Sequence, residues 1–117
     1  TFAGDGDNSE DGIGTNAEIH RPGGISISSD GSFAVIAAAF GNKIRKLVIS
    51  TSEVTTISDS SAFDEPYGIA LSADNSFALV AGNNDHRIRK VIISTGEVST
   101  FVGTNAGNSD GVGTDAR

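Results

Sequence analysis

The sequence contains an internal repeat, and this repeat restricts the fold more than any other feature. A shift of 44 residues aligns residues 22–57 with residues 66–101 without a gap, and half of the aligned positions are identical. A second match pairs residues 1–17 with residues 100–116, so that "DGIGTNA" lies on "DGVGTDA". Tandem copies of one unit indicate an array in which each unit packs on its neighbour.

Each repeated unit has the pattern of short β-strands. Apolar residues alternate or run in short blocks between turn residues, and no helical periodicity occurs. Asp30-Gly31 and Asp74-Asn75 tolerate the positive φ that tight turns require. The apolar second strand of each unit is expected to be buried on both faces. The predicted strands are residues 24–28, 32–37, 43–49 and 54–57 in the first unit, and 68–72, 76–81, 87–93 and 98–102 in the second.

Four short antiparallel strands in each unit are typical of a β-propeller blade. An immunoglobulin-like sandwich has a similar number of strands, but its strands do not repeat as a block. We therefore predict an all-β fold of two propeller blades, each a four-stranded antiparallel meander. The predicted organisation is a connecting loop with the end of a preceding strand in residues 1–21, blade 1 in 22–65, blade 2 in 66–103, and a repeated connecting loop in 104–117.

The motifs of the two units resemble the NHL repeat family of β-propellers. Pro-X-Gly-Ile occurs at residues 22–25 and 66–69, a Ser-X-Asp-X-Ser-Phe-Ala motif follows each copy, and "NDHRIRKV" covers residues 84–91. The first unit departs from the pattern, because residues 39–42 read "AFGN" where residues 83–86 read "NNDH". The resemblance implies a scaffold that binds protein or ligand through a face made of loops.

Two blades are too few to close a propeller, which uses about four to eight. The chain is therefore expected to be part of a longer repeat domain or to associate with copies of itself. A trimer would supply six blades, a number that the resemblance to NHL propellers makes natural. In that ring, residues 100–117 of one chain would take the place of residues 1–17 of the next, so one copy would be displaced.

The long connections of a four-stranded meander share one rim, and loops held by a rigid scaffold are where binding residues concentrate. The alternative is that the Asp and Gly residues of these loops only form turns that face water. The candidate binding residues on the loop face are Asp5, Asp7, Asp11, Phe40, Asn83, Asn84, Asp85, His86 and Asp110.

Metal and cofactor motifs are incomplete. An EF-hand loop that starts at Asp5 has Glu10 where Gly is required and Asn16 at the last ligand position, so the motif fails. A looser calcium or magnesium site in the acidic connector remains an alternative. The G-x-G-x-x-A sequences at residues 12–17 and 111–116 precede no predicted helix, so we interpret them as turns. No metal site and no cofactor are predicted.

Catalytic motifs are also missing from the sequence. There is no Cys and no G-x-S-x-G motif, and His20 and His86 are the only imidazole bases. We predict no catalytic residues and therefore a chain that is not an enzyme. Two alternatives stay open: a piece of a metal-dependent six-bladed propeller hydrolase or lyase, and a purely architectural repeat that assembles with itself.

The net charge of -7 disfavours binding to nucleic acids and to anionic membranes. No aromatic residues alternate with the basic ones to stack bases. We therefore predict a protein or small ligand as partner, with no nucleic acid and no membrane. The basic residues are expected to pair with Glu53 and Glu97 or with acidic loops. They form two equivalent clusters, Lys43, Arg45 and Lys46, and Arg87, Arg89 and Lys90.

Overall fold

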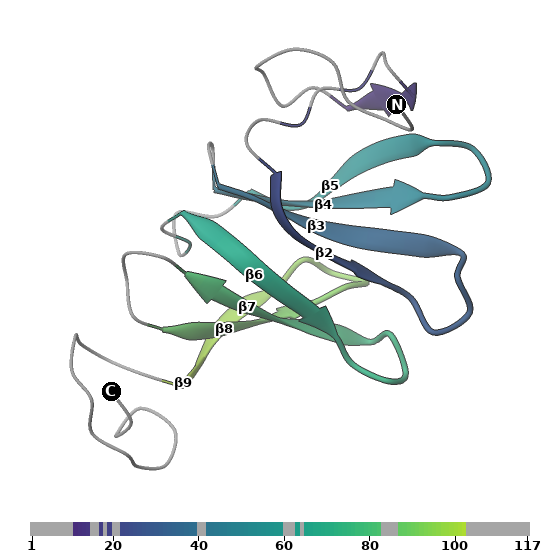
Figure 1. The fold of residues 1–117 in the computed structure, drawn as a ribbon. Helices are drawn as coiled ribbons and strands as arrows, with labels where there is room; N and C mark the ends of the chain where they lie inside the picture. Colours follow the sequence, from purple (N-terminus) through teal and green to yellow (C-terminus); the bar gives the residue numbers. More distant parts are fainter. Residues whose placement is uncertain are drawn as a thin grey trace.

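The chain forms two antiparallel β-sheets, which are the two predicted blades (Figure 1). The computed structural model describes residues 11–14, 17, 19, 22–39, 42–59, 63, 65–82 and 87–102. In these ranges the chain has nine strands and no α-helix. A helix long and apolar enough to cross a membrane is likewise absent from these ranges. The prediction of an all-β fold of propeller blades is confirmed.

Each blade is a meander in which neighbouring strands in the sequence pair antiparallel. Blade 1 consists of β2 (Pro22–Ile27), β3 (Phe33–Ala38), β4 (Lys43–Val48) and β5 (Glu53–Asp59). Blade 2 consists of β6 (Pro66–Leu71), β7 (Phe77–Gly82), β8 (Ile88–Ile92) and β9 (Val98–Val102). These bounds agree with the predicted strands to within two residues at each end.

Blade 1 has a fifth strand, which lies in the segment predicted to be a connecting loop. β1 (Gly12–Ile13) pairs antiparallel with the free edge of β5, so that Gly12 lies opposite Val54 and Ile13 lies opposite Glu53. A strand of two residues that includes a glycine has no alternating pattern from which to predict it. The connector before blade 1 therefore completes the sheet of that blade.

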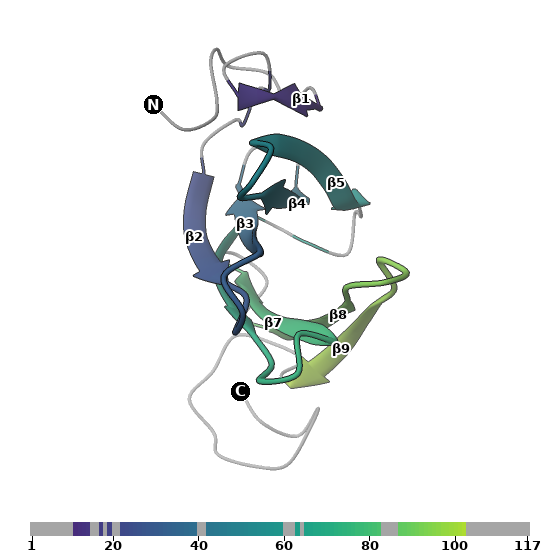
Figure 2. The same cartoon turned by 90° about the vertical axis from the view of Figure 1, so that its right-hand side faces the viewer.

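The two blades pack face to face (Figure 2), with β2 beside β6 (Figure 1). Glycine allows this close approach, because a Cβ atom built on Gly24 would lie 2.6 Å from the carbonyl oxygen of Tyr67. A shared apolar core fills the space between the blades. Its buried members are Ala37 and Ile44 of blade 1, Val80 and Val91 of blade 2, and Phe63 from the connection between them.

Strand register gives each blade two distinct faces. We call the face with Ala34, Leu47 and Val54 the leading face of blade 1, and its equivalent in blade 2 carries Ala78, Val91 and Val98. The opposite, trailing face carries Ala37 and Ile44 in blade 1, and Ala81 and Ile88 in blade 2. The trailing face of blade 1 packs on the leading face of blade 2.

The two remaining faces differ in what covers them. The leading face of blade 1 packs against Ala17 and Ile19 of the connector. On the trailing face of blade 2, Leu79 and Ala81 are only half-buried, whereas the equivalent Val35 and Ala37 of blade 1 are buried. The expectation that both second strands are buried on both faces therefore holds for β3 and is wrong for β7, because no described element covers the trailing face of blade 2.

Candidate functional site

Eight of the nine candidate binding residues lie outside the residues that the structure describes. These are Asp5, Asp7, Phe40, Asn83, Asn84, Asp85, His86 and Asp110. Asp11 is described, and it lies on the leading side of blade 1 just before β1.

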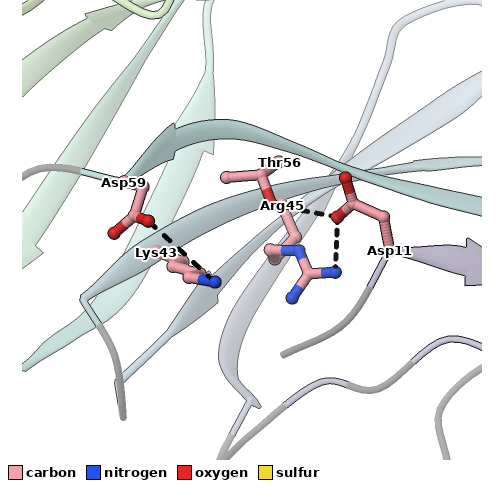
Figure 3. A network of polar contacts seen from close by, with 5 residues as sticks. All are labelled: Asp11, Lys43, Arg45, Thr56 and Asp59. Atoms are coloured by element: carbon pink, nitrogen blue, oxygen red, sulfur yellow. Dashed lines mark hydrogen bonds and ion pairs between the residues drawn. The ribbon is translucent and has the colours of Figure 1, made fainter. Parts of the chain in front are cut away.

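Asp11 anchors the connector to blade 1 through one carboxylate oxygen (Figure 3). Arg45 Nη2 donates a hydrogen bond to Asp11 Oδ1 over 2.9 Å, and Thr56 Oγ1 donates to the same oxygen over 3.0 Å. The Arg45 side chain is fully buried, and a buried charge is costly unless it has ionic and hydrogen-bond partners. The prediction that basic residues pair with an acidic loop is thus confirmed for Arg45.

Blade 2 repeats part of this arrangement without the connector. Arg89 and Thr100 are the equivalents of Arg45 and Thr56, and Arg89 Nη1 donates a hydrogen bond to Thr100 Oγ1. The connection between the blades, residues 60–65, is shorter than the connector before blade 1, residues 1–21.

The lysines of the basic clusters have partners other than the predicted glutamates. Lys46 Nζ lies 4.7 Å from the ring centroid of Phe33, and in blade 2 Lys90 Nζ lies 4.6 Å from that of Phe77. Lys43 forms an ion pair of 4.0 Å with Asp59. The expected pairing with Glu53 is wrong, because the register places Glu53 opposite Val48 and not opposite a basic residue.

One end of the blades carries the tight turns, and we call it the turn rim. It consists of residues 28–32 and 49–52 in blade 1, and 72–76 and 93–96 in blade 2. At Asp30, one carboxylate oxygen accepts hydrogen bonds from Ser28 Oγ, Ser32 N and Ser32 Oγ over 2.8, 2.9 and 2.7 Å. Asp74 accepts the same three bonds from Ser72 and Ser76 over 2.8, 3.0 and 2.7 Å.

These hydrogen bonds stabilise the ionised form of both carboxylates. The bonds from Ser32 and Ser28 lower the pKa of Asp30 to about 2, and those from Ser76 and Ser72 lower the pKa of Asp74 to about 2. Both carboxylates are exposed, so their donors account for the low pKa values. The Ser-X-Asp-X-Ser motif therefore stabilises the same turn in both blades, and we call this set of hydrogen bonds the turn lock.

A side-chain clasp joins the two blades at the turn rim. Asn75 Oδ1 accepts a hydrogen bond from Ser29 N over 3.1 Å, and Asn75 Nδ2 donates to Ser29 Oγ over 3.0 Å. Asn75 has a φ of 64°, a conformation that Asn tolerates better than most residues. The repeat-equivalent positions carry Gly31 and Ala73, which have no polar side chain, so the clasp is specific to this pair of blades.

The opposite end carries the long connections, and we call it the loop rim. Its described members are residues 22, 38, 39, 42, 43 and 59 in blade 1, and residues 65, 66, 82, 87, 88 and 102 in blade 2. Glu65 N donates a hydrogen bond of 3.0 Å to Asn42 Oδ1, which ties the blade-to-blade connection to the loop between β3 and β4. Asn42 and Glu65 both have positive φ, 55° and 52°, so the chain turns sharply at these two points.

Two shallow apolar hollows lie on the faces without a neighbouring blade. One, of about 320 Å³, is on the leading face of blade 1 between Ile19, Gly24 and Ile36. The other, of about 360 Å³, is on the trailing face of blade 2 between Ala70, Leu79 and Ile88. Among the residues described, no group of three or more His, Asp or Glu side chains is placed to hold a metal ion.

Comparisons with known proteins relate the chain to solved structures by fold. No family model and no curated protein matches the sequence. A protein of unknown function from Bacteroides thetaiotaomicron superposes with a TM-score of 0.68 at 17% identity, over 87% of this chain and 26% of that one. Hydrazine synthase of Kuenenia stuttgartiensis superposes with a TM-score of 0.62 at 23% identity, over 75% and 25% of the two chains.

The chain therefore spans about a quarter of the length of both solved structures. At this level of identity the likeness concerns the fold alone. It agrees with the two sheets described above: this chain is built from β-propeller-like blades of the kind that recur in longer β-rich proteins.

Proposed function

We propose that the chain supplies two blades of an NHL-like propeller that acts as a non-catalytic scaffold and binds a protein or ligand through its loop rim. One observation carries this proposal. The turn rim repeats the same hydrogen bonds around Asp30 and Asp74, whereas the loops between the second and third strands differ completely, "AFGN" in blade 1 and "NNDH" in blade 2. A fixed scaffold with divergent loops is the usual organisation of a binding surface.

The candidate contact residues of this proposal are those of the divergent loops, Phe40 and residues 83–86, together with the acidic residues of the connectors. The net charge of -7 favours a partner that carries cationic groups. In the assembled form, three copies of the chain would place six sets of such loops on one rim. The scaffold would then present a ring of repeated binding loops.

The test compares one loop-rim variant with one turn-rim variant. Proteins captured by the immobilised chain are quantified for the wild type, for Asn84→Ala/Asp85→Ala and for the control Asp74→Asn. We expect a specific partner to be lost from the loop-rim variant and retained by the control, with the folded fraction of each checked by circular dichroism. Equal capture by both variants would contradict the assignment of binding to the loop rim.

The non-catalytic part of the proposal has its own test, since metal-dependent enzymes are the alternative class. We expect the purified chain to contain less than one divalent metal ion per chain and to keep its thermal midpoint after treatment with a chelator. Stoichiometric metal together with a lowered midpoint after chelation would contradict it.

A further inference from the structure

The connector before blade 1 is a docked segment with a defined set of contacts. Asp11 binds Arg45 and Thr56, and β1 extends the sheet at the edge of β5. Gly14 N donates a hydrogen bond of 2.8 Å to Ser52 O, and Gly14 has a φ of 60°. Ala17 is fully buried in the core of the leading face. The edge of β5, Arg45 and the leading face together form a receptor for this segment.

Residues 110–116 carry the same chemical groups at the same spacing. Asp110 matches Asp11, and Val112 matches the strand residue Ile13. The remaining two requirements are stricter. Gly14 has a positive φ, which favours glycine, and Gly113 matches it. Ala17 is fully buried, so its position requires a small apolar residue, and Ala116 matches it.

The corresponding place on blade 2 is not a free receptor. Gly96 is the repeat equivalent of Ser52, and a Cβ built on Gly96 would lie 2.2 Å from the carbonyl oxygen of Ile57. The backbone of blade 1 therefore lies close against Gly96 of blade 2. The leading face of blade 2 is covered as well, because Val80 and Val91 are fully buried against blade 1.

From these observations we propose that residues 110–116 bind the receptor on blade 1 of a second copy of the chain, in place of that copy's residues 11–17. The inference rests on the self-association proposed above and names the segment that links the copies. It is independent of what the loop rim binds.

The proposed contact between two copies would resemble a contact that already exists within one chain. Blade 1 already packs its trailing face on the leading face of blade 2. A second copy would bring the trailing face of its blade 2, with Leu79 and Ile88, against the leading face of blade 1, where Ile25 and Ile27 are 60% and 63% exposed. Such a head-to-tail contact joins different surfaces and can close into a ring.

Residues 11–17 of the receiving copy compete with the incoming residues 110–116 for the receptor. They are attached to the same chain as the receptor and therefore have a high effective concentration. Residues 110–116 can therefore displace residues 11–17 only if the blade that arrives with them also covers apolar area on the leading face of blade 1. This predicts an association that increases with protein concentration and with any change that weakens the binding of residues 11–17.

Disulfide trapping tests the proposal directly, since these 117 residues contain no cysteine. Ile13 lies opposite Glu53, so Val112 of an incoming segment would lie opposite the Glu53 of the receiving copy. A Glu53→Cys chain is mixed with a Val112→Cys chain and oxidised mildly. We expect a disulfide-linked pair of chains, detected by mass spectrometry of the peptides.

Three controls make the experiment decisive. The double variant Ile13→Cys/Glu53→Cys should form a disulfide within one chain, which establishes that the geometry allows the bond. Glu97→Cys, at the equivalent place in blade 2, should not be trapped by Val112→Cys, either in a mixture or in one chain. In the trapping mixture, adding Asp110→Ala should weaken trapping about tenfold, as expected for loss of a charge-assisted hydrogen bond, whereas Asp115→Ala should not.

The results separate the inference from the broader proposal. If Glu53→Cys is not trapped by Val112→Cys while the Ile13→Cys/Glu53→Cys control forms its bond, the docking of residues 110–116 is wrong. Trapping of Glu97→Cys by Val112→Cys would also overturn it, since the segment would then bind blade 2. In either case, a measured oligomer of the wild-type chain would leave the proposed self-association standing, and a monomer would remove both.

Discussion

The leading faces of the two blades are built from equivalent residues and have different surroundings. Ile69 of blade 2 is half-buried against blade 1, whereas its repeat equivalent Ile25 is 60% exposed. The connections before the blades show the same contrast, since Phe63 is buried between the blades and its equivalent Ile19 is only half-buried. Burial in this fold therefore depends on the neighbouring blade as much as on the residue itself.

The largest predicted effect concerns the residue that fills the space between the blades. Phe63→Ala removes a buried ring from the shared core and should lower the free energy of unfolding by about 3–5 kcal/mol, measured by urea denaturation. The matched variant Ile19→Ala removes a half-buried side chain and should cost about 1–2 kcal/mol. Equal effects of the two variants would contradict the difference between the faces.

A second prediction concerns the close approach of β2 and β6. Gly24→Ala places a Cβ 2.6 Å from the backbone oxygen of Tyr67 and should lower the unfolding free energy by about 1–3 kcal/mol. At the equivalent Gly68, the nearest atom is the Cβ of Ala81 at 3.4 Å, an ordinary contact, so Gly68→Ala should have a smaller effect. A more destabilising change at Gly68 would contradict the described packing of the blades.

A third prediction concerns the anchor of the connector. Asp11→Ala removes a carboxylate that accepts a hydrogen bond from the buried Arg45, and it should lower the unfolding free energy by about 1–2 kcal/mol. Asp59→Ala removes the partner of the more exposed Lys43 and should cost less than about 0.5 kcal/mol. If Asp59→Ala has the larger effect in denaturation, the anchor does not depend on Asp11.

The smallest predicted difference between the blades is at the turn rim. The turn locks of Asp30 and Asp74 do not depend on contact with the neighbouring blade. The pKa values of Asp30 and Asp74 are lowered from 3.8 to about 2, so both ionised groups favour the folded state above pH 4. This stabilisation is lost as the pH falls from 4 through 2. Thermal melts between pH 2 and pH 5 should show equally reduced pH dependence for Asp30→Asn and Asp74→Asn, and unequal slopes would contradict the equivalence.

The repeat made the fold predictable, because a gapless alignment of two units indicates strand lengths and turns together. Other features depend on distances between segments that the sequence does not encode locally. The two-residue strand β1 pairs with the edge of β5, and the residue before it, Asp11, is bound by Arg45. The register of β4 and β5, which places Glu53 opposite Val48, could not be derived from residue types. Of the candidate site, the sequence indicated that basic residues pair with acidic loops, but it did not identify Asp11 as the partner of Arg45.

The mass of the 117-residue chain in solution, measured as a function of concentration, tests the proposed self-association. If the leading face of blade 1 accepts the trailing face of another copy, sedimentation equilibrium should show masses that rise from 11.9 kDa towards three times that value. Ile27→Lys, at a position that is 63% exposed in the single chain, should remain folded and shift this equilibrium towards the monomer. A folded wild-type chain that stays monomeric at every concentration would contradict the account.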